Sequence, residues 1–252
     1  MKRAQWEIKL GIILVLATVL LYIIHFLIFR DPHHIFIYLF GDIAFLPLEV
    51  LLVTLIIHRL LEHQEKQDRM EKINMVIGTF FSEAGTKLLA YFSSSDIEIE
   101  NMKEHLFVDE KWSDDNFQQI RKTLHSHNYK IEIGKIDLSA LRTYLINKRM
   151  FLVNLLDSPV LLEHEKFTDL LMSVFHLTEE LECRDDIQHI PASDRAHLAN
   201  DIKRAYSLLA YRWLDYAMHL KHHYPYLFSL VVRTNPFNRN ASPVITGAEA
   251  AH

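Results

Sequence analysis

The pattern of apolar and polar positions divides the chain into a strongly apolar beginning and a longer amphipathic remainder. Residues 10–29 carry no formal charge, and a second apolar stretch covers residues 35–57 after the polar segment 30–34. Each stretch is long enough to cross a hydrocarbon core of about 30 Å as a helix that rises about 1.5 Å per residue. The pattern therefore predicts a transmembrane hairpin within residues 1–61, which makes the chain an integral, multi-pass membrane protein.

Basic residues around the two stretches predict the orientation of the hairpin. They flank it at both ends, at Lys2, Arg3, Lys9, Arg59, Lys66, Arg69 and Lys72. The turn has only Arg30, next to Asp31. Because short loops rich in Lys and Arg stay on the cytoplasmic side, we expect both termini in the cytoplasm, at the cell membrane of a prokaryote. The rival interpretation is a buried hairpin of a soluble protein, but residues 10–29 lack the polar stripe that such a helix exposes.

Two acidic residues interrupt the second apolar stretch. Asp42 and Glu49 are seven residues apart, almost two helical turns, so both project from one face. A charged residue at the centre of a transmembrane helix costs about 2.5–3.5 kcal/mol on insertion scales, so it should face protein or water. His25 can meet Asp42 at a similar depth, and Thr18 is level with Glu49. Two interpretations stay open: polar contacts that join helices, or several copies that line a cation or proton pathway.

A helical stalk is predicted over residues 62–95. Acid-first pairs at i, i+4, such as Glu62 with Lys66, support a solvated continuation of the second span. Farther on, an apolar seam recurs at spacings of three and four, at Met70, Ile73, Ile77, Phe80, Ala84, Leu88 and Tyr91. The seam predicts coiled-coil-like packing against another helix, of the same chain or of a second copy.

Residues 96–237 show helical periodicity interrupted by short polar turns, which predicts an all-α cytoplasmic bundle. Ser113 and Asp137 are expected to cap the first two of its long helices. The predicted helices cover about residues 113–127, 137–156, 161–183 and 193–222. The alternating segment 129–134 is too short to make a sheet alone.

Histidines and acids share one side of the last two predicted helices. They are His176, Glu180, His197, Asp201, His219 and His222. Such residues can build a metal site between facing helices, but the Glu-x-x-His pairs of carboxylate-bridged bundles are absent. We expect these side chains to form a solvated polar face opposite the apolar stripe, with a metal site as the alternative. No other cofactor is predicted.

An apolar segment with aromatic residues follows the last long helix. Tyr224, Tyr226 and Phe228 belong to it, and most such segments plug a bundle. The alternative is contact with a protein partner or with the inner leaflet, where tyrosine rings sit well. Residues 238–252 are small and polar, so we expect a disordered tail there.

Composition narrows the possible functions. Residues 1–61 have a net charge of +1 and the remainder −6, without a run of Lys and Arg that could bind a row of phosphates, so nucleic acid is not an expected partner. Cys183 is the one cysteine, and no nucleophile or nucleotide-binding motif occurs. We therefore expect a membrane-anchored, non-enzymatic helical protein that binds a protein partner or forms a homo-oligomer through its cytoplasmic domain. The alternatives are an oligomeric channel using Glu49 and Asp42, and a membrane-tethered metalloprotein.

Overall fold

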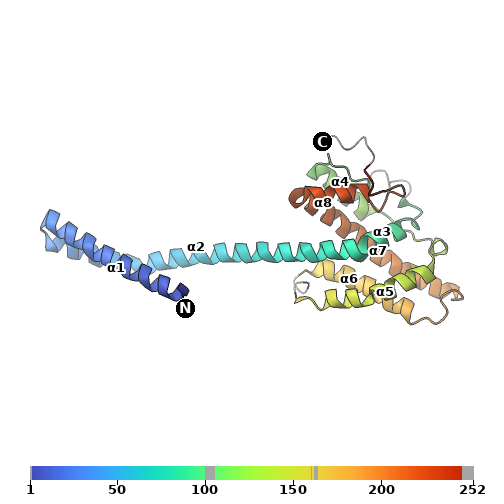
Figure 1. The fold of residues 1–252 in the computed structure, drawn as a ribbon, viewed down its shortest axis with the longest axis horizontal. Coiled ribbons are helices and arrows are strands. Elements are labelled where there is room, and N and C mark those ends of the chain that lie inside the picture. Colours follow the sequence, from blue (N-terminus) through green and yellow to red (C-terminus); the bar gives the residue numbers. More distant parts are fainter. Residues whose placement is uncertain (1, 100–105, 160, 162–163, 246–252) are drawn as a thin grey trace. The chain divides into compact units, whose positions relative to one another are not determined.

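The computed structural model describes residues 2–99, 106–159, 161 and 164–245. Among these residues the regular structure is helical. The β pairing is limited to an isolated antiparallel bridge between Asp96 and Ile131. The all-α prediction is therefore confirmed. The chain divides into two compact units, Met1–Lys66 and Gln67–His252 (Figure 1).

The first unit contains helix α1 (Lys2–Phe29) and the first part of helix α2 (Pro32–Phe80). Arg30 turns the chain with a left-handed backbone, φ 50°. The carboxylate of Asp31 then accepts the backbone N–H of His33 at 3.0 Å. Pro32 opens α2 at a position where no backbone donor is needed, so the polar segment works as a helix stop followed by a helix start.

Both helices of this unit are long and apolar enough to cross a membrane, over Lys9–Phe29 and from Ile35 onward. None of the side chains in their most apolar windows is buried within the protein. Leu21 and Phe40 illustrate this, with 66% and 77% of their surfaces exposed. Helix α2 continues without interruption through Pro47.

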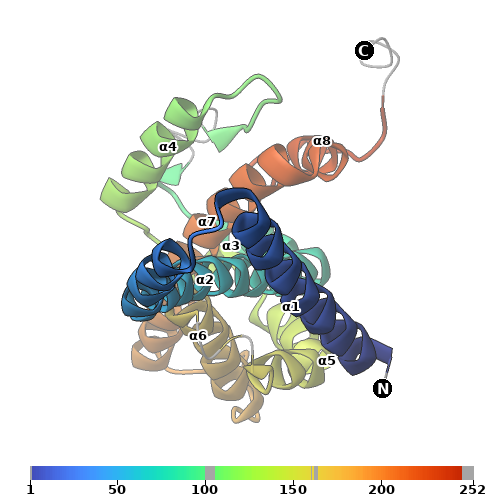
Figure 2. The same cartoon turned by 90° about the vertical axis from the view of Figure 1, so that its left-hand side faces the viewer.

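The second unit is a helical bundle, built from the end of α2 and the elements that follow it. Those elements are a π-helical turn (Phe81–Gly85), α3 (Thr86–Ser93), α4 (Asp114–Ser126), a 3₁₀ turn (Ile133–Lys135), α5 (Leu138–Leu156), α6 (Glu165–Glu182), α7 (Ala192–His223) and α8 (Pro225–Arg233). Helices α5 and α6 lie together on one side of α7, while α4 and α8 lie on the other side (Figures 1 and 2). Helix α7 is therefore covered from several directions.

The predicted apolar seam is buried inside this bundle except at its two ends, where Met70 is exposed and Tyr91 is half-buried. Ile73, Ile77 and Phe80 are buried in the same core as Trp213 of α7. At Gly78, a Cβ atom would lie 3.4 Å from the ring of Tyr216 on α7. Because α7 and its neighbours bury these positions, the seam has its helix partner within its own chain.

The predicted helix caps are present at α4 and α5. Ser113 forms a capping box with Asn116, and the Asp137 carboxylate accepts the N–H of Ala140. Two other helix starts differ from the prediction: α6 begins at Glu165, after His164 caps it, and α7 begins at Ala192. Of the expected disordered tail, residues 239–240 form a turn closed by the hydrogen bond from Ala241 N to the Asn238 carbonyl, residues 241–245 have no regular structure, and residues 246–252 lie outside the described residues.

Candidate functional sites

Four of the six predicted metal ligands lie together between α6 and α7. His176 and Glu180 are one turn apart on α6, and His197 and Asp201 are one turn apart on α7. Atoms of His176, Glu180 and Asp201 that could bind a metal lie within 4.8 Å of one another. Since residues at i and i+4 share a helix face, each helix contributes one imidazole and one carboxylate to the cluster.

The expectation that all six predicted metal ligands are solvated is wrong for Asp201. Its side chain is only 3% exposed, although the sequence pattern assigns it to the polar side of α7. The physical reason is the position of α7, which other helices cover on more than its apolar stripe. One oxygen, Oδ2, has no hydrogen-bond partner among the described residues, so a buried acceptor points into the cluster.

The separations across the cluster are similar to one another. Nε2 of His176 lies 3.7 Å from a Glu180 oxygen and 3.8 Å from Oδ2 of Asp201. Nε2 of His197 lies 3.3 Å from the same Asp201 oxygen and 3.5 Å from the second oxygen of Glu180. His176, Glu180 and Asp201 therefore surround one small volume, and His197 lies beside Glu180 and Asp201.

Arginines that the sequence analysis did not select support the cluster. The guanidinium of Arg184 lies 2.8 Å from Glu180 and 2.6 Å from Asp194. That pairing with Arg184 lowers the pKa of Glu180 and of Asp194, with a further contribution from His197 to both. Arg204 lies 3.4 Å from the other oxygen of Asp201. The signal that could have found these arginines is their helical spacing, since Arg184 follows Glu180 by four residues and Arg204 follows Asp201 by three.

The remaining two metal candidates lie elsewhere on α7 and have other partners. Nδ1 of His219 lies 3.2 Å from the side-chain amide of Asn74, and burial lowers the pKa of His219. His222 lies 2.8 Å from Asp114 at the start of α4. The structure thus separates His219 and His222 from the cluster.

In the first unit, a groove of 340 Å³ lies between the two helices next to the turn. Thr18, His25 and Asp42 line it, together with apolar residues and Tyr38. Thr18 donates its hydroxyl to the carbonyl of Leu14, one turn back in α1. Glu49 lies outside this groove with an exposed side chain, and the described residues offer its carboxylate no hydrogen bond or ion pair.

The predicted contact segment becomes α8 and the residue before it. Tyr226 is 71% exposed, whereas Phe228 is buried and its ring lies near that of Phe117. Phe228 is therefore a core residue and not part of a contact surface. Tyr224 is half-buried, and the outward side of α8 presents Tyr226, Leu227 and Leu230.

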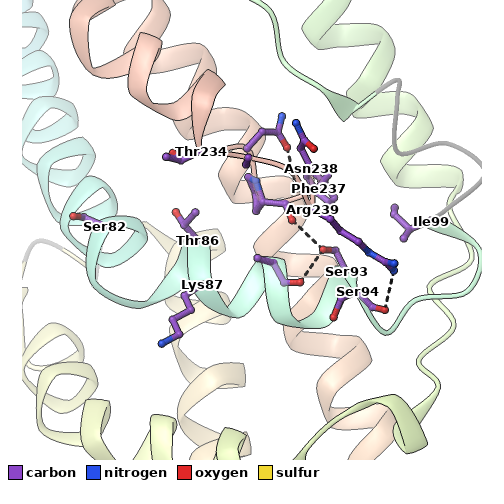
Figure 3. Close-up of a pocket in the computed structure, with 14 residues that line it drawn as sticks. Ser82, Thr86, Lys87, Ser93, Ser94, Ile99, Thr234, Phe237, Asn238 and Arg239 are labelled. Carbon is purple, nitrogen blue, oxygen red and sulfur yellow. Dashed lines mark hydrogen bonds between the residues drawn. The ribbon is translucent and has the colours of Figure 1, made fainter. Parts of the chain in front are cut away.

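A further pocket of 480 Å³ lies between α3 and the segment 234–241 (Figure 3). The hydroxyl of Ser93 contacts the carbonyls of Ala90 and Pro236, and Arg239 reaches the carbonyl of Ser94. Lys87 extends away from that segment and lies over the ring of Tyr144. These polar groups hold the segment against α3, so they do not converge on a ligand.

Comparison with known proteins gives a family but no activity. Residues 69–233 match the family described as "Uncharacterized protein MJ1433, C-terminal helical domain", and residues 2–61 match "MJ1433, N-terminal helical domain". A Methanocaldococcus jannaschii protein, described as "Uncharacterized protein MJ1433", is 43% identical over 241 residues, 96% of this chain and 97% of the relative. No solved structure matches. The chain therefore belongs to the MJ1433 family of proteins with N-terminal and C-terminal helical domains.

Proposed function

We propose that this protein is a membrane-anchored helical protein whose bundle, on the cytoplasmic side, binds a protein partner or another copy of itself. The observation that carries the proposal is the exposure of the apolar side chains on α1 and on α2 from Ile35 onward. Soluble proteins rarely expose contiguous apolar patches larger than a few hundred Å². A lipid environment removes the free-energy cost of this surface.

The lengths of the helices fit a bilayer. The stretch Lys9–Phe29 has 21 residues, which corresponds to about 30 Å at the rise of an α-helix. The turn at Arg30 and Asp31 reverses the chain, so a second crossing returns it to the side where it began. Basic residues at both ends of the hairpin favour the cytoplasm for that side.

The bundle supplies the surface for association. On α8, Tyr226 and Leu227 are exposed, and so is Leu230, which follows Tyr226 by four residues and therefore lies on the same side of the helix. Tyrosine is enriched at protein interfaces because its ring buries apolar area while its hydroxyl keeps a hydrogen bond. This surface is the part of the bundle that we assign to a protein partner or a second copy.

Labelling of single cysteines tests the anchor. A Cys183→Ser background removes the one native thiol, and His33→Cys or Gln64→Cys then places a thiol in the turn or in the stalk. In intact cells, we expect a membrane-impermeant maleimide to label His33→Cys, and to label Gln64→Cys only after permeabilisation. Release of the protein from membranes by alkaline carbonate, or equal labelling of both positions in intact cells, would overturn the proposal.

A second candidate function rests on Glu49. It lies near the middle of the predicted second span, and its carboxylate makes no hydrogen bond or ion pair with the described residues of the chain. An acid in such a position needs protein or water around it. Several copies that place Glu49 around a common axis meet this need and would form a pathway for cations or protons.

A further inference from the structure

We infer that His176, Glu180, His197 and Asp201 bind one divalent first-row transition-metal ion between α6 and α7. This site lies in the helical bundle and does not depend on the membrane anchor. It rests on two independent observations. The ligand atoms of His176, Glu180 and Asp201 lie within 4.8 Å of one another, with His197 3.3 Å from Asp201 and 3.5 Å from Glu180, and the buried Oδ2 of Asp201 points among them.

The distances suit a shared ion better than direct hydrogen bonds. Ligands at about 2.1 Å from a tetrahedral ion are about 3.4 Å from one another. The four nitrogen–oxygen separations run from 3.3 Å between His197 and Asp201 to 3.8 Å between His176 and Asp201. Well-formed hydrogen bonds of this kind are shorter, at about 2.7–3.0 Å. A cation among His176, Glu180 and Asp201 can therefore be shared by these three groups, and His197, beside Asp201 and Glu180, supplies the fourth ligand.

Asp201 provides the second argument. A buried carboxylate oxygen without a hydrogen bond is unfavourable unless a cation or a donor satisfies it. Arg204 lies beside Oδ1 of Asp201, whereas Oδ2 faces His176 and His197. Neutral histidines present a lone pair to a metal, so a bound ion satisfies the carboxylate and both imidazoles together.

The ligand set indicates the chemical class of ion. Two imidazole nitrogens with two carboxylate oxygens suit Zn²⁺, Fe²⁺ or Mn²⁺, whereas Mg²⁺ and Ca²⁺ prefer oxygen ligands throughout. The side chains of His176 and His197 are 44% and 52% exposed, so an ion can enter from solvent. Arg184 orients Glu180 from outside the cluster, as the outer partners of metal ligands do.

Metal binding by the full-length protein in detergent tests the inference. After treatment with EDTA, the protein is equilibrated with Zn²⁺ and separated from free metal, and the bound ion is counted by mass spectrometry. We expect about one ion per chain at a closed set of four ligands. Co²⁺ in its place should give visible absorption typical of low coordination number.

Matched histidine variants locate the ion. We expect His176→Ala combined with His197→Ala to weaken Zn²⁺ binding by more than about 100-fold. Replacing a residue that only hydrogen-bonds to a metal ligand already lowers metal affinity by about 10- to 100-fold, and these two residues are ligands themselves. Combined His222→Ala and His223→Ala removes exposed histidines outside the cluster and should leave the affinity unchanged. Circular dichroism verifies that each variant is folded, and Glu180→Gln replaces the double variant if that fails to fold. Absence of bound Zn²⁺ in the wild type, equal binding by the double variant, or loss of binding in the control would overturn the inference.

Discussion

One carboxylate oxygen of Asp96 lies 2.7 Å from Nε2 of His127, and both side chains are almost completely buried. The other carboxylate oxygen of Asp96 accepts the backbone N–H groups of Glu98 and Lys130. The ring of Tyr129 packs edge-on against His127, with centroids 4.6 Å apart. Through this one carboxylate, the chain after α3 is tied to the segment after α4.

Replacing His127 should destabilise the bundle strongly. His127→Ala leaves the buried Asp96 carboxylate without its side-chain partner, and removing one member of a buried pair costs about 3–5 kcal/mol. Urea denaturation, followed by circular dichroism, measures the change in the free energy of unfolding.

The pair of Asp186 and His189 is a matched control. Its atoms are 2.8 Å apart, but both side chains are largely exposed. Exposed pairs contribute little because solvent screens them. We expect His189→Ala to leave the urea midpoint unchanged, and a similar shift for both variants would contradict the role given to burial.

Gly85 permits a close approach of two aromatic rings at the π-helical turn. A Cβ atom at this position would lie 2.7 Å from ring carbons of both Phe80 and Phe81, which are fully buried. Gly85→Ala should therefore destabilise the bundle by about 1–3 kcal/mol, as overpacking of a core does. Thermal or urea denaturation measures the loss.

Gly78→Ala is the control for that substitution. Its Cβ atom would be 3.4 Å from the Tyr216 ring, an ordinary contact, and the position is helical. Because alanine favours a helix by roughly 0.5–1 kcal/mol over glycine, the variant should be neutral or slightly stabilised. A loss as large as that of Gly85→Ala would show that crowding by the phenylalanines is not the cause.

The parts of the fold that depend on local sequence could be predicted. The capping residues Ser113 and Asp137 occupy the predicted positions, and periodicity identified the apolar seam whose Ile73, Ile77 and Phe80 are buried. These features need only a few neighbouring residues, because caps and helix faces repeat within one or two turns.

Other features depend on packing between distant segments. Asp201 is buried because helices surround α7 on several sides. A single apolar stripe in the sequence, by contrast, predicts that one face of a helix is buried. The contact of Asp96 with His127 joins residues 31 positions apart, and no local period predicts it. The same limit affected the cluster with His176: the spacing selected its members, but only the pairing of α6 with α7 brought them together.

Acid should weaken the bundle through His219. Burial, together with His222 and His223, lowers the pKa of His219, whereas Glu71 raises it. The Asn74 amide lies 3.2 Å from Nδ1 and can donate to it only while that nitrogen is unprotonated. A lowered pKa in the folded state means that the unfolded chain binds the proton first, so stability is present above pH 6.5 and falls as the pH decreases below it.

The His219→Gln variant measures this contribution. Glutamine can still accept a hydrogen bond from Asn74 but does not titrate. The variant should therefore lose less unfolding free energy than the wild type between about pH 7.5 and about pH 5.5. These values lie roughly one unit on either side of the ordinary histidine pKa. His63→Gln changes an exposed histidine and should leave the pH dependence as it is. Equal pH dependence in all three proteins would exclude a role of His219.

Self-association should depend on Glu49. A hydrogen bond between transmembrane helices contributes about 0.6–2 kcal/mol, which corresponds to roughly a 3- to 30-fold change in an association constant. We expect Glu49→Leu to weaken assembly in detergent by such a factor, while Glu49→Gln keeps a hydrogen-bonding side chain and assembles. Val50→Leu, an apolar exchange at the next residue, is the control. Analytical ultracentrifugation measures the association of the wild type and the three variants.

Cation uptake by liposomes separates a pathway from a purely structural contact. If assembled copies place Glu49 around a conducting axis, the carboxylate charge attracts cations, and Glu49→Gln removes the charge while it retains assembly. Uptake should then fall at least about tenfold in the variant, a change of about 1.4 kcal/mol in the barrier. Glu62→Gln, in the stalk, should conduct like the wild type. Assembled protein without uptake in any version would instead mean that Glu49 joins helices and that the hairpin acts as an anchor alone.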